Sequence, residues 1–378
     1  MWIMALLTAI FLFVYPFVVY PAILYMMTRW RLQNSEEEQM VATELPAVAL
    51  VICALNEQNC IREKIENCLA LQYPAGRLQI VLISDGSTDQ TASIAKQYEP
   101  SIQVIEQKTR RGKVMNLNDV LPSRAEDILV LSDANVIYRS DALLRLVSRF
   151  ADPSVGCVSG RVILTGTTIA LEGPTKDYYS LEWFLQEKSS SVYSMTGADG
   201  AMYALRRELF RPCPNDTLVE DFIVPMGVIG QGKRVVFEPN AVGWEKGVAS
   251  IREEFRRKVR IAAGAAQGLI RGNAWPRNAP PRFWFIFLSH KLLRWLSPVV
   301  GLAILLLCIF SAEQTSARVV MGGFAVLGGL ALFRLGTGWT HPVLSAPFYF
   351  LFGQLALGIG LLKGITGTQT VFWAKANR

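Results

Sequence analysis

The chain of 378 residues has very little histidine and no closely spaced cysteine pair. Its only two histidines, His290 and His341, lie in or beside apolar segments near the C-terminus. A zinc site with histidine ligands in a soluble domain is therefore excluded, and any metal must be held mainly by oxygen ligands. The six cysteines show no C-x-x-C spacing, and five of them lie between Cys53 and Cys213. Free thiols in a reducing, cytoplasmic compartment are therefore expected.

Interleaved base-stacking aromatic residues, internal repeats and low-complexity tracts are also missing. The net charge of +7 is concentrated between Arg252 and Arg294, where ten Lys or Arg residues face only Glu253 and Glu254. The rest of the chain is close to neutral. A basic segment beside apolar runs indicates contact with anionic headgroups or substrate phosphates, and nucleic-acid binding is not expected.

Long apolar runs occur at both ends of the chain. Residues 2–27 carry no charge and are long enough to cross a hydrocarbon core of roughly 30 Å. A secretory signal is the rival interpretation, but a basic n-region and a small-x-small cleavage site are missing. Arg29 and Arg31 follow the run, so the positive-inside bias predicts that the next domain is cytoplasmic.

Three further apolar runs are candidate membrane spans: residues 292–310, 319–333 and 343–362. The second is only marginally long enough. Three crossings from a cytoplasmic domain would place Lys363, Lys375 and Arg378 outside, against the charge bias. Either one run is therefore re-entrant, or residues 283–296 form an additional buried or interfacial segment.

The middle of the chain alternates short β-rich runs with helical ones. Strands are predicted at residues 47–54, 78–84, 101–107 and 128–133, and helices at 57–71, 88–98 and 113–121. This alternation predicts parallel strands with crossover helices, and the continuously apolar strands indicate that both sheet faces are covered. A basic amphipathic helix follows Arg252 and is expected to lie along the membrane interface. The expected regions are a transmembrane helix (1–32), a linker (33–46), a cytoplasmic domain (47–250), an amphipathic region (251–282) and a C-terminal transmembrane region (283–378).

Polar residues follow three of the predicted strands, where ligands bind in an open α/β sheet. Asn56 and Glu57 follow the first strand, Asp85 follows the second, and Asp133 ends the fourth. The rival interpretation of Asp85, within Asp85-Gly86-Ser87-Thr88-Asp89, is a turn followed by a helix N-cap. A common position at three strand ends favours a shared binding site.

Asp133-x-Asn135 suits a divalent cation that bridges a nucleotide diphosphate. Because Asn135 is neutral, such a site should bind metal weakly until the diphosphate supplies the missing charge. The loop with Arg110, Arg111 and Lys113 opens a predicted helix and favours an anion, although a solvated basic loop is the alternative.

Glu220 and Asp221 lie in an otherwise apolar stretch, where adjacent carboxylates are costly unless they have a function. A sugar hydroxyl acting as a nucleophile needs a positioned base, and Asp221 is the candidate for that base. The structural alternative is a helix N-cap.

These motifs, in the order ALNEQ, SDGSTD, RRGKVMNLN, SDAN, TGADGAMYALRR, VED and RRKVR, resemble the inverting family 2 glycosyltransferases. The resemblance spans residues of about 47–271 and is to the membrane branch with cellulose, hyaluronan and poly-N-acetylglucosamine synthases. It implies an α/β fold with a nucleotide-sugar-binding GT-A (Rossmann-like) domain, a mixed, mainly parallel sheet, and transmembrane and interfacial α-helices. It also implies a UDP-sugar donor and a Mn²⁺ or Mg²⁺ cofactor.

The resemblance assigns roles by position. The residues that match nucleotide-binding positions are Asn56, Glu57, Asp85, Lys113 and Asp133. Asp133 and Asn135 match the metal-binding D-x-D motif, and Asp221, after Glu220, matches the general base of a T-E-D motif. Asp199 and Gly200 belong to the loop 197–200, which matches a loop that approaches the acceptor.

Two departures from the family pattern stand out. Val219 replaces the threonine before Glu220-Asp221, and the family's Q-x-x-R-W reads Arg257-Lys258-Val259-Arg260-Ile261. Arg257 therefore takes the glutamine position on the acceptor side, and Arg260 keeps the cation that can neutralise a departing diphosphate. The lost tryptophan supports a growing polymer in processive relatives, so its absence favours single transfer to a lipid-linked acceptor.

The function expected is an inverting, metal-dependent hexosyltransferase of the inner or plasma membrane, acting on a lipid-linked or polysaccharide acceptor, with envelope-polysaccharide assembly partners. A processive polysaccharide synthase and a catalytically silent nucleotide-sugar-binding scaffold are the alternatives. A transporter is disfavoured because ionisable groups are sparse in the apolar runs. His290, Lys291 and Arg294 depart from that rule and are expected to face headgroups or an acceptor phosphate.

Overall fold

The computed structural model of the protein describes residues 2–29, 45–166, 174–247 and 250–372. Arg31, Lys375, Arg378 and most of the expected linker lie outside these residues. The strands are β1 (Val48–Ala54), β2 (Leu78–Ser84), β3 (Gln103–Glu106), β4 (Ile128–Asp133), β5 (Val136–Tyr138), β6 (Val155–Thr165), β7 (Met202–Arg206) and β8 (Arg234–Lys246). The helices of the soluble domain are α3 (Ile61–Leu69), α4 (Thr91–Lys96), α5 (Lys113–Val120), α6 (Ala142–Ser148), α7 (Pro174–Val192) and α8 (Glu220–Gly230).

The eight strands form one mixed sheet in the order β3-β2-β1-β4-β7-β6-β8-β5. Strands β1 to β4 pair in parallel, as predicted, and β7 joins β4 antiparallel. The predicted helices 57–71 and 88–98 are shorter, as α3 and α4, because the chain before each one is drawn into a loop. Asn56 has a left-handed backbone (φ 55°), and its Oδ1 accepts a hydrogen bond from the backbone N–H of Thr88 (2.8 Å).

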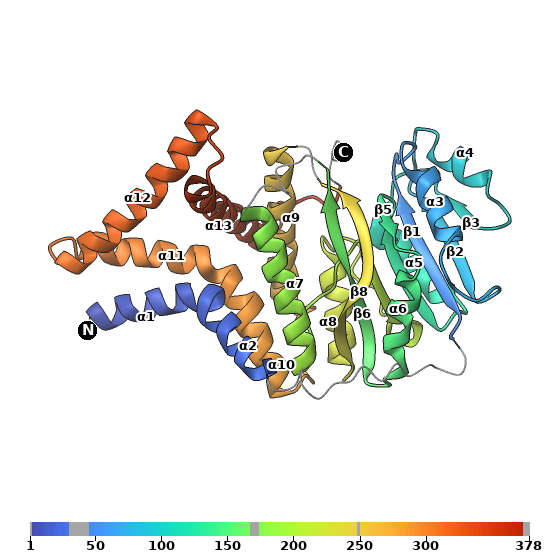
Figure 1. Cartoon of the computed structure of the whole chain (residues 1–378), viewed down its shortest axis with the longest axis horizontal. Coiled ribbons are helices and arrows are strands. Elements are labelled where there is room, and N and C mark those ends of the chain that lie inside the picture. Colours follow the sequence, from blue (N-terminus) through green and yellow to red (C-terminus); the bar gives the residue numbers. More distant parts are fainter. Residues whose placement is uncertain (1, 30–44, 167–173, 248–249, 373–378) are drawn as a thin grey trace.

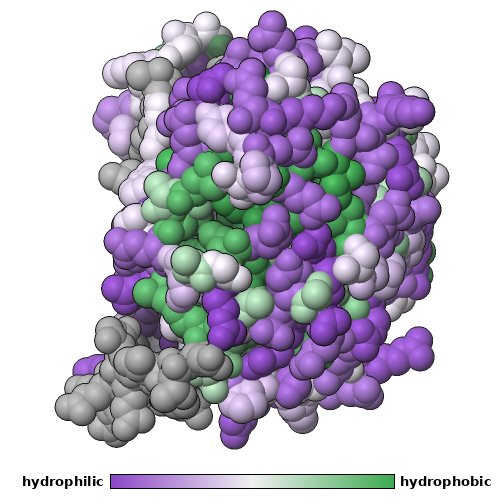
Figure 2. Space-filling view, turned by 90° about the vertical axis from the view of Figure 1, so that its right-hand side faces the viewer, coloured by the Kyte–Doolittle hydropathy of each residue, from purple (hydrophilic) through white to green (hydrophobic). Residues whose placement is uncertain are grey.

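Strand β1 shows why the sheet is buried on both faces. Val48, Leu50 and Ile52 contribute to a core with α3, α4 and α6, whereas Ala49 and Val51 contribute to the core on the other face. That second core includes α5 and α8 and continues into the apolar helices. Figure 2 shows the end of the domain that carries β2, β3, α3 and α4, where hydrophilic residues surround a hydrophobic area.

The remaining helices lie on the other side of the domain, where α9, together with α7, is next to the sheet and the apolar helices extend beyond both (Figure 1). They are α1 (Trp2–Val14), α2 (Tyr20–Arg29), α9 (Ile251–Ile270), α10 (Pro281–Ile286), α11 (Leu293–Phe310), α12 (Thr315–Thr337) and α13 (Pro342–Thr366), with π-helical turns at Tyr15–Val19 and Phe287–Leu292. Within the described residues, four helical segments are long and apolar enough to cross a membrane: residues 2–29, 281–310, 315–337 and 342–366. The expected marginal run is thus part of a 23-residue helix.

The amphipathic helix is confirmed as α9, which begins with a capping interaction between Ser250 Oγ and the backbone N–H of Glu253 (3.2 Å). Its apolar face is covered by protein, however. Gly360 and Gly364 of α13 pack so closely on Ala262 and the backbone of α9 that a Cβ at either glycine would clash. The last apolar helix therefore sits on α9.

The chain beyond α13 returns to the soluble domain. The Arg110 guanidinium lies 5.1 Å from the Phe372 ring centroid, and Val371 lies near Gly112. Because these residues contact the domain from which α10 departs, any membrane crossings between the two points must be even in number. The three C-terminal apolar helices therefore cannot all cross completely, although each of them is long and apolar enough to do so.

His290, Lys291 and Arg294 do not face outward as expected. Glu182 of α7 accepts from Lys291 (3.0 Å) and Arg294 (2.8 Å) and lies 3.5 Å from His290 Nε2. Burial alone would raise the pKa of Glu182, but Arg294 and Lys291 hold it well below its usual range. A partner 109 residues away in sequence, invisible to a local pattern, thus ties α7 to the apolar helices.

Candidate active site

The polar residues that follow β1, β2 and β4 meet at one edge of the sheet. The parallel register pairs Ala54 with Ser84 and Cys53 with Asp133, so these strands end side by side. Asn56, Asp85 and Asp133 therefore occupy neighbouring positions, as the sequence predicts.

Asp85 holds the basic loop in place. Its Oδ1 accepts from the backbone N–H of Arg111 (2.7 Å), and its Oδ2 accepts from that of Gly112 (2.9 Å). The N-cap position of α4 is Gln90, and Asp89, one residue earlier, accepts with its Oδ1 from the backbone N–H of Thr91 (2.9 Å). Asp85 thus fixes the loop that leads to Lys113.

Asn56 and Glu57 shape the first loop of the site. The backbone N–H of Asn56 donates to Ser87 Oγ (3.1 Å), which ties the loop after β1 to the loop after β2. The backbone N–H of Glu57 donates to Thr91 Oγ1 (2.7 Å), and its carboxylate accepts from Cys60 Sγ (3.2 Å). Both residues lie at the predicted edge.

Lys113 joins the two acidic motifs. Its Nζ lies 2.9 Å from Asp133 Oδ1 and 2.7 Å from Glu220 Oε1, and it also donates to the Gly200 carbonyl (3.3 Å). Burial alone would lower the pKa of Lys113, but Asp133 and Glu220 hold it well above its usual range. The Lys113 ammonium group therefore connects the end of β4, the loop 197–200 and the start of α8.

Asp221 lies in the first turn of α8, next to Glu220. Burial, and then the charge of Glu220, raise the pKa of Asp221 to about 6, against the opposing effects of Lys113 and Arg260. A carboxylate with that pKa is ionised at neutral pH and is close enough in basicity to accept a proton. Val219 precedes the helix and has no polar side-chain atom, so neither acid takes the N-cap position proposed as the alternative.

The loop 197–200 packs against Asp221. The backbone N–H of Ala198 donates to the Asp221 carbonyl (2.8 Å). Asp199 Oδ1 accepts from the backbone N–H of Ala201 (3.1 Å), while burial, together with Glu245, Asp221 and Asp133, raises the pKa of Asp199 to about 7. Asp199 and Gly200 are thus brought to Asp221.

The residues around Asp133 fit a hard divalent cation. Lys113 pairs with Asp133 Oδ1, and Asn135 Nδ2 donates to Glu245 Oε1 (3.1 Å). Asp133 Oδ2 and Asn135 Oδ1 are oxygen donors of the kind that Mg²⁺ and Mn²⁺ prefer. Among the described residues, no three His, Cys, Asp or Glu side chains are grouped so as to hold an ion. This donor set suits a metal that takes further ligands from a diphosphate.

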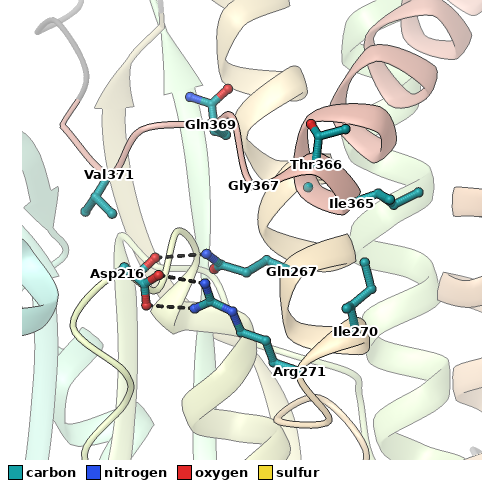
Figure 3. Close-up of a pocket in the computed structure, with 10 residues that line it drawn as sticks. Asp216, Gln267, Ile270, Arg271, Ile365, Thr366, Gly367, Gln369 and Val371 are labelled. Carbon is teal, nitrogen blue, oxygen red and sulfur yellow. Dashed lines mark hydrogen bonds and ion pairs between the residues drawn. The ribbon is translucent and has the colours of Figure 1, made fainter.

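Helix α9 holds the loop that precedes α8. Arg260 Nη1 donates to the Leu218 carbonyl (3.1 Å), and Gln267 Oε1 accepts from the Leu218 N–H (3.2 Å). Figure 3 shows Gln267 and Arg271 converging on Asp216 beside a cavity of about 240 Å³, with both guanidinium nitrogens of Arg271 paired to its carboxylate (2.7 and 2.6 Å). The loop leading to Asp221 is therefore held by α9.

Arg257 points elsewhere on the same helix. Its guanidinium donates to both carboxylate oxygens of Glu254 (2.8 and 3.0 Å) and to Tyr179 Oη (2.8 Å). Burial would lower the pKa of Arg257, but Tyr179, Glu254 and Glu245 raise it well above its usual range. Its contacts are with α7 and its own helix rather than with the base.

Sequence reasoning missed Lys64 and Glu245. Lys64 is fully buried beneath the turn that carries Asp133. The signal was present, because Ile61, Ile65 and Cys68 form a buried helical stripe that includes position 64. Glu245 lies in β8, and its neighbours in sequence carry no comparable signal.

The fold is that of a domain of GT-A type. Residues 49–213 match the family model described as Glycosyl transferase family 2. A mannosyltransferase from Pyrobaculum calidifontis, solved in complex with GDP-Man and Mn²⁺, matches 97% of this chain and 100% of that chain, with a TM-score of 0.73 and 23% identity. That likeness confirms the fold.

Two curated relatives were also found. The chain is 26% identical over 233 residues to the probable glycosyltransferase YdaM of Bacillus subtilis, covering 58% of this chain and 56% of the relative. It is 25% identical over 235 residues to the poly-beta-1,6-N-acetyl-D-glucosamine synthase of Staphylococcus aureus, covering 60% of this chain and 57% of the relative. The matches thus span a little over half of the length of these relatives.

Proposed function

We propose that the protein is an inverting membrane glycosyltransferase that moves a sugar from a UDP-sugar to a hydroxyl of a lipid-linked or polysaccharide acceptor. The observation that supports this function is the bridge made by Lys113 between Asp133 and Glu220. This bridge links the end of β4, which we assign to the diphosphate, to Glu220, the neighbour of the proposed base Asp221, whose pKa is raised to about 6. A donor and a nucleophile can therefore meet at one place.

In this mechanism Asp221 takes the proton of the acceptor hydroxyl as that oxygen attacks the anomeric carbon. The bond to the nucleotide diphosphate breaks in the same displacement, so the configuration at that carbon inverts. Lys113 and Arg260 offset the negative charge that develops on the leaving group. Mn²⁺ or Mg²⁺ held by Asp133 and Asn135 would supply Lewis-acid stabilisation of the same charge.

Asn56, Glu57 and Asp85 are proposed to shape the nucleotide pocket, while Asp199, Gly200 and Arg257 are assigned to the acceptor side. For Arg257 the role is indirect, since Glu254 and Tyr179 occupy its guanidinium. A cytoplasmic domain, consistent with Arg29 after the first span, would give the donor direct access.

The test uses the full chain purified into nanodiscs that contain bacterial lipid extract. Radiolabelled UDP-sugars and GDP-sugars are supplied with Mn²⁺ or Mg²⁺, and Asp221→Asn protein serves as the inactive control. We expect label to pass from one donor to a lipid or polymer only with the wild type. If no donor is transferred or hydrolysed, the enzyme assignment fails and the scaffold alternative gains.

A processive polysaccharide synthase is the second candidate, favoured by the Staphylococcus aureus relative. Ile261, at the place of the family's tryptophan, opposes it. The two candidates differ in product length: a single labelled sugar on a lipid supports single transfer, whereas a ladder of long chains supports polymerisation.

A further inference from the structure

A buried lysine of α3 makes hydrogen bonds on both sides of the turn that carries Asp133, Ala134 and Asn135. Lys64 of α3 has no exposed surface, and its Nζ donates to Ser132 Oγ (2.7 Å) and to the Val136 carbonyl (2.6 Å). These two acceptors flank the turn on either side. One ammonium group therefore fixes both ends of the turn.

The same helix holds the strand that follows. Asn67 Nδ2 donates to the Tyr138 carbonyl (2.8 Å), and Asn67 Oδ1 accepts from the Tyr138 N–H (2.8 Å). Lys64 Nζ also lies 4.1 Å from the centroid of the Tyr138 ring. Among the described strands β5 is paired with β8 alone, and the contacts of α3 hold its other side.

A buried ammonium group is costly, and an apolar side chain of similar length would fill the same space without that cost. Ile61, Ile65 and Cys68, on the same stripe, show that this face of α3 otherwise packs as apolar core. The lysine is therefore better explained by what its hydrogen bonds hold in place than by packing.

Glu245 of β8 also contacts this turn, through a hydrogen bond from Asn135. Its Oε1 accepts from Asn135 Nδ2 (3.1 Å). A carboxylate only accepts hydrogen bonds, so it selects the amide nitrogen and leaves the amide oxygen as the end that can ligate a cation. An asparagine without this partner could turn either end toward the metal.

We propose that Lys64 and Glu245 are positioning residues that set the Asp133–Asn135 turn for a divalent cation and its diphosphate. The inference rests on the proposed function, because it assumes that the turn binds a metal–nucleotide pair. Residues that orient metal ligands typically change metal affinity by about 10- to 100-fold when they are replaced.

The test measures binding without any sugar transfer. Mn²⁺ binding to the purified full chain is followed by electron paramagnetic resonance with UDP, and separately with GDP, and nucleotide binding is also measured in EDTA. The variants are Lys64→Met, Glu245→Ala and Glu245→Gln. Lys188→Met is the matched control, because Lys188 is a mostly buried lysine of α7 that pairs with Glu187 outside the site.

We expect Lys64→Met and Glu245→Ala to weaken Mn²⁺ binding by roughly tenfold or more, with little change in metal-free nucleotide binding. Glu245→Gln can still accept from Asn135 but can also donate to it, so its Mn²⁺ affinity should lie between those of the wild type and Glu245→Ala. Lys188→Met should bind Mn²⁺ like the wild type. Equal Mn²⁺ affinity in all variants overturns the proposal. If Lys64→Met does not fold, the contrast between Glu245→Ala and Glu245→Gln decides alone.

The same measurements distinguish a failure of the proposed metal site from a failure of the roles of Lys64 and Glu245. If the wild type binds no Mn²⁺ with either nucleotide, the metal site of the proposed function is refuted. If the wild type binds Mn²⁺ and the variants match it, only the positioning roles of Lys64 and Glu245 are refuted.

Discussion

A Cβ placed on Gly200 would stand 2.6 Å from Oδ2 of Asp221, closer than real Cβ contacts allow. The backbone of the loop 197–200 therefore runs directly against Asp221, the candidate base, and only glycine permits this approach. The Gly200 carbonyl also accepts from Lys113, so the contact joins three parts of the site.

Gly200→Ala is therefore expected to displace the Asp221 carboxylate and to lower sugar transfer by about tenfold or more, because small misplacements of reacting groups are costly. Donor binding should change little. The measurements are kcat and nucleotide affinity. Gly227→Ala in α8 is the control, since a Cβ there would meet no other atom within 4 Å among the described residues. Full activity of Gly200→Ala would show that the contact is unimportant.

Removing the base without changing its size should remove catalysis. Asp221→Asn is expected to fold and insert normally but to lose about 100-fold or more in kcat, the range that general base catalysis contributes. Asp127→Asn is a suitable control because Asp127 is exposed and precedes β4 at its far end. Wild-type turnover by Asp221→Asn protein would rule out this residue as the base.

The pH profile should report the same carboxylate. The base works only when ionised, so kcat/KM should fall as the pH drops through the Asp221 pKa of about 6. Because the charge of Glu220 helps to raise that pKa, Glu220→Gln should move the acid limb to lower pH, even if the rate falls.

Glu187→Gln is the matched control for this profile, as Glu187 pairs with Lys188 on α7. Its acid limb should coincide with that of the wild type. An unchanged limb in Glu220→Gln protein, or a shift to higher pH, would contradict the assignment.

Metal removal should show whether sugar transfer needs a cation held by Asp133 and Asn135. Treatment with EDTA is expected to abolish transfer, and added Mn²⁺ or Mg²⁺ should restore it. Asp133→Asn should raise the Mn²⁺ concentration needed for half-maximal activity by about tenfold or more, while Asp127→Asn, at the other end of the same strand, should not. Activity that survives exhaustive chelation would refute a metal-dependent mechanism.

The sequence alone determined the local parts of the protein. Nearly continuous apolar runs predicted β1, β2 and β4, because a strand covered on both faces is apolar along most of its length. The order of these strands then placed Asn56, Asp85 and Asp133 at one edge. The helix periodicity after Arg252 predicted α9.

Only the tertiary structure decided which distant residues meet. Lys113 contacts Glu220, Asn135 contacts Glu245 and Glu182 contacts Arg294, and in each case the partners lie more than 100 residues apart. Periodicity reports which face of an element is apolar, but it carries no record of the partner that covers a polar atom. Long-range polar contacts, the contacts of α3 with the turn of Asp133 to Asn135 and the return of Phe372 to the domain therefore depend on how the chain folds as a whole.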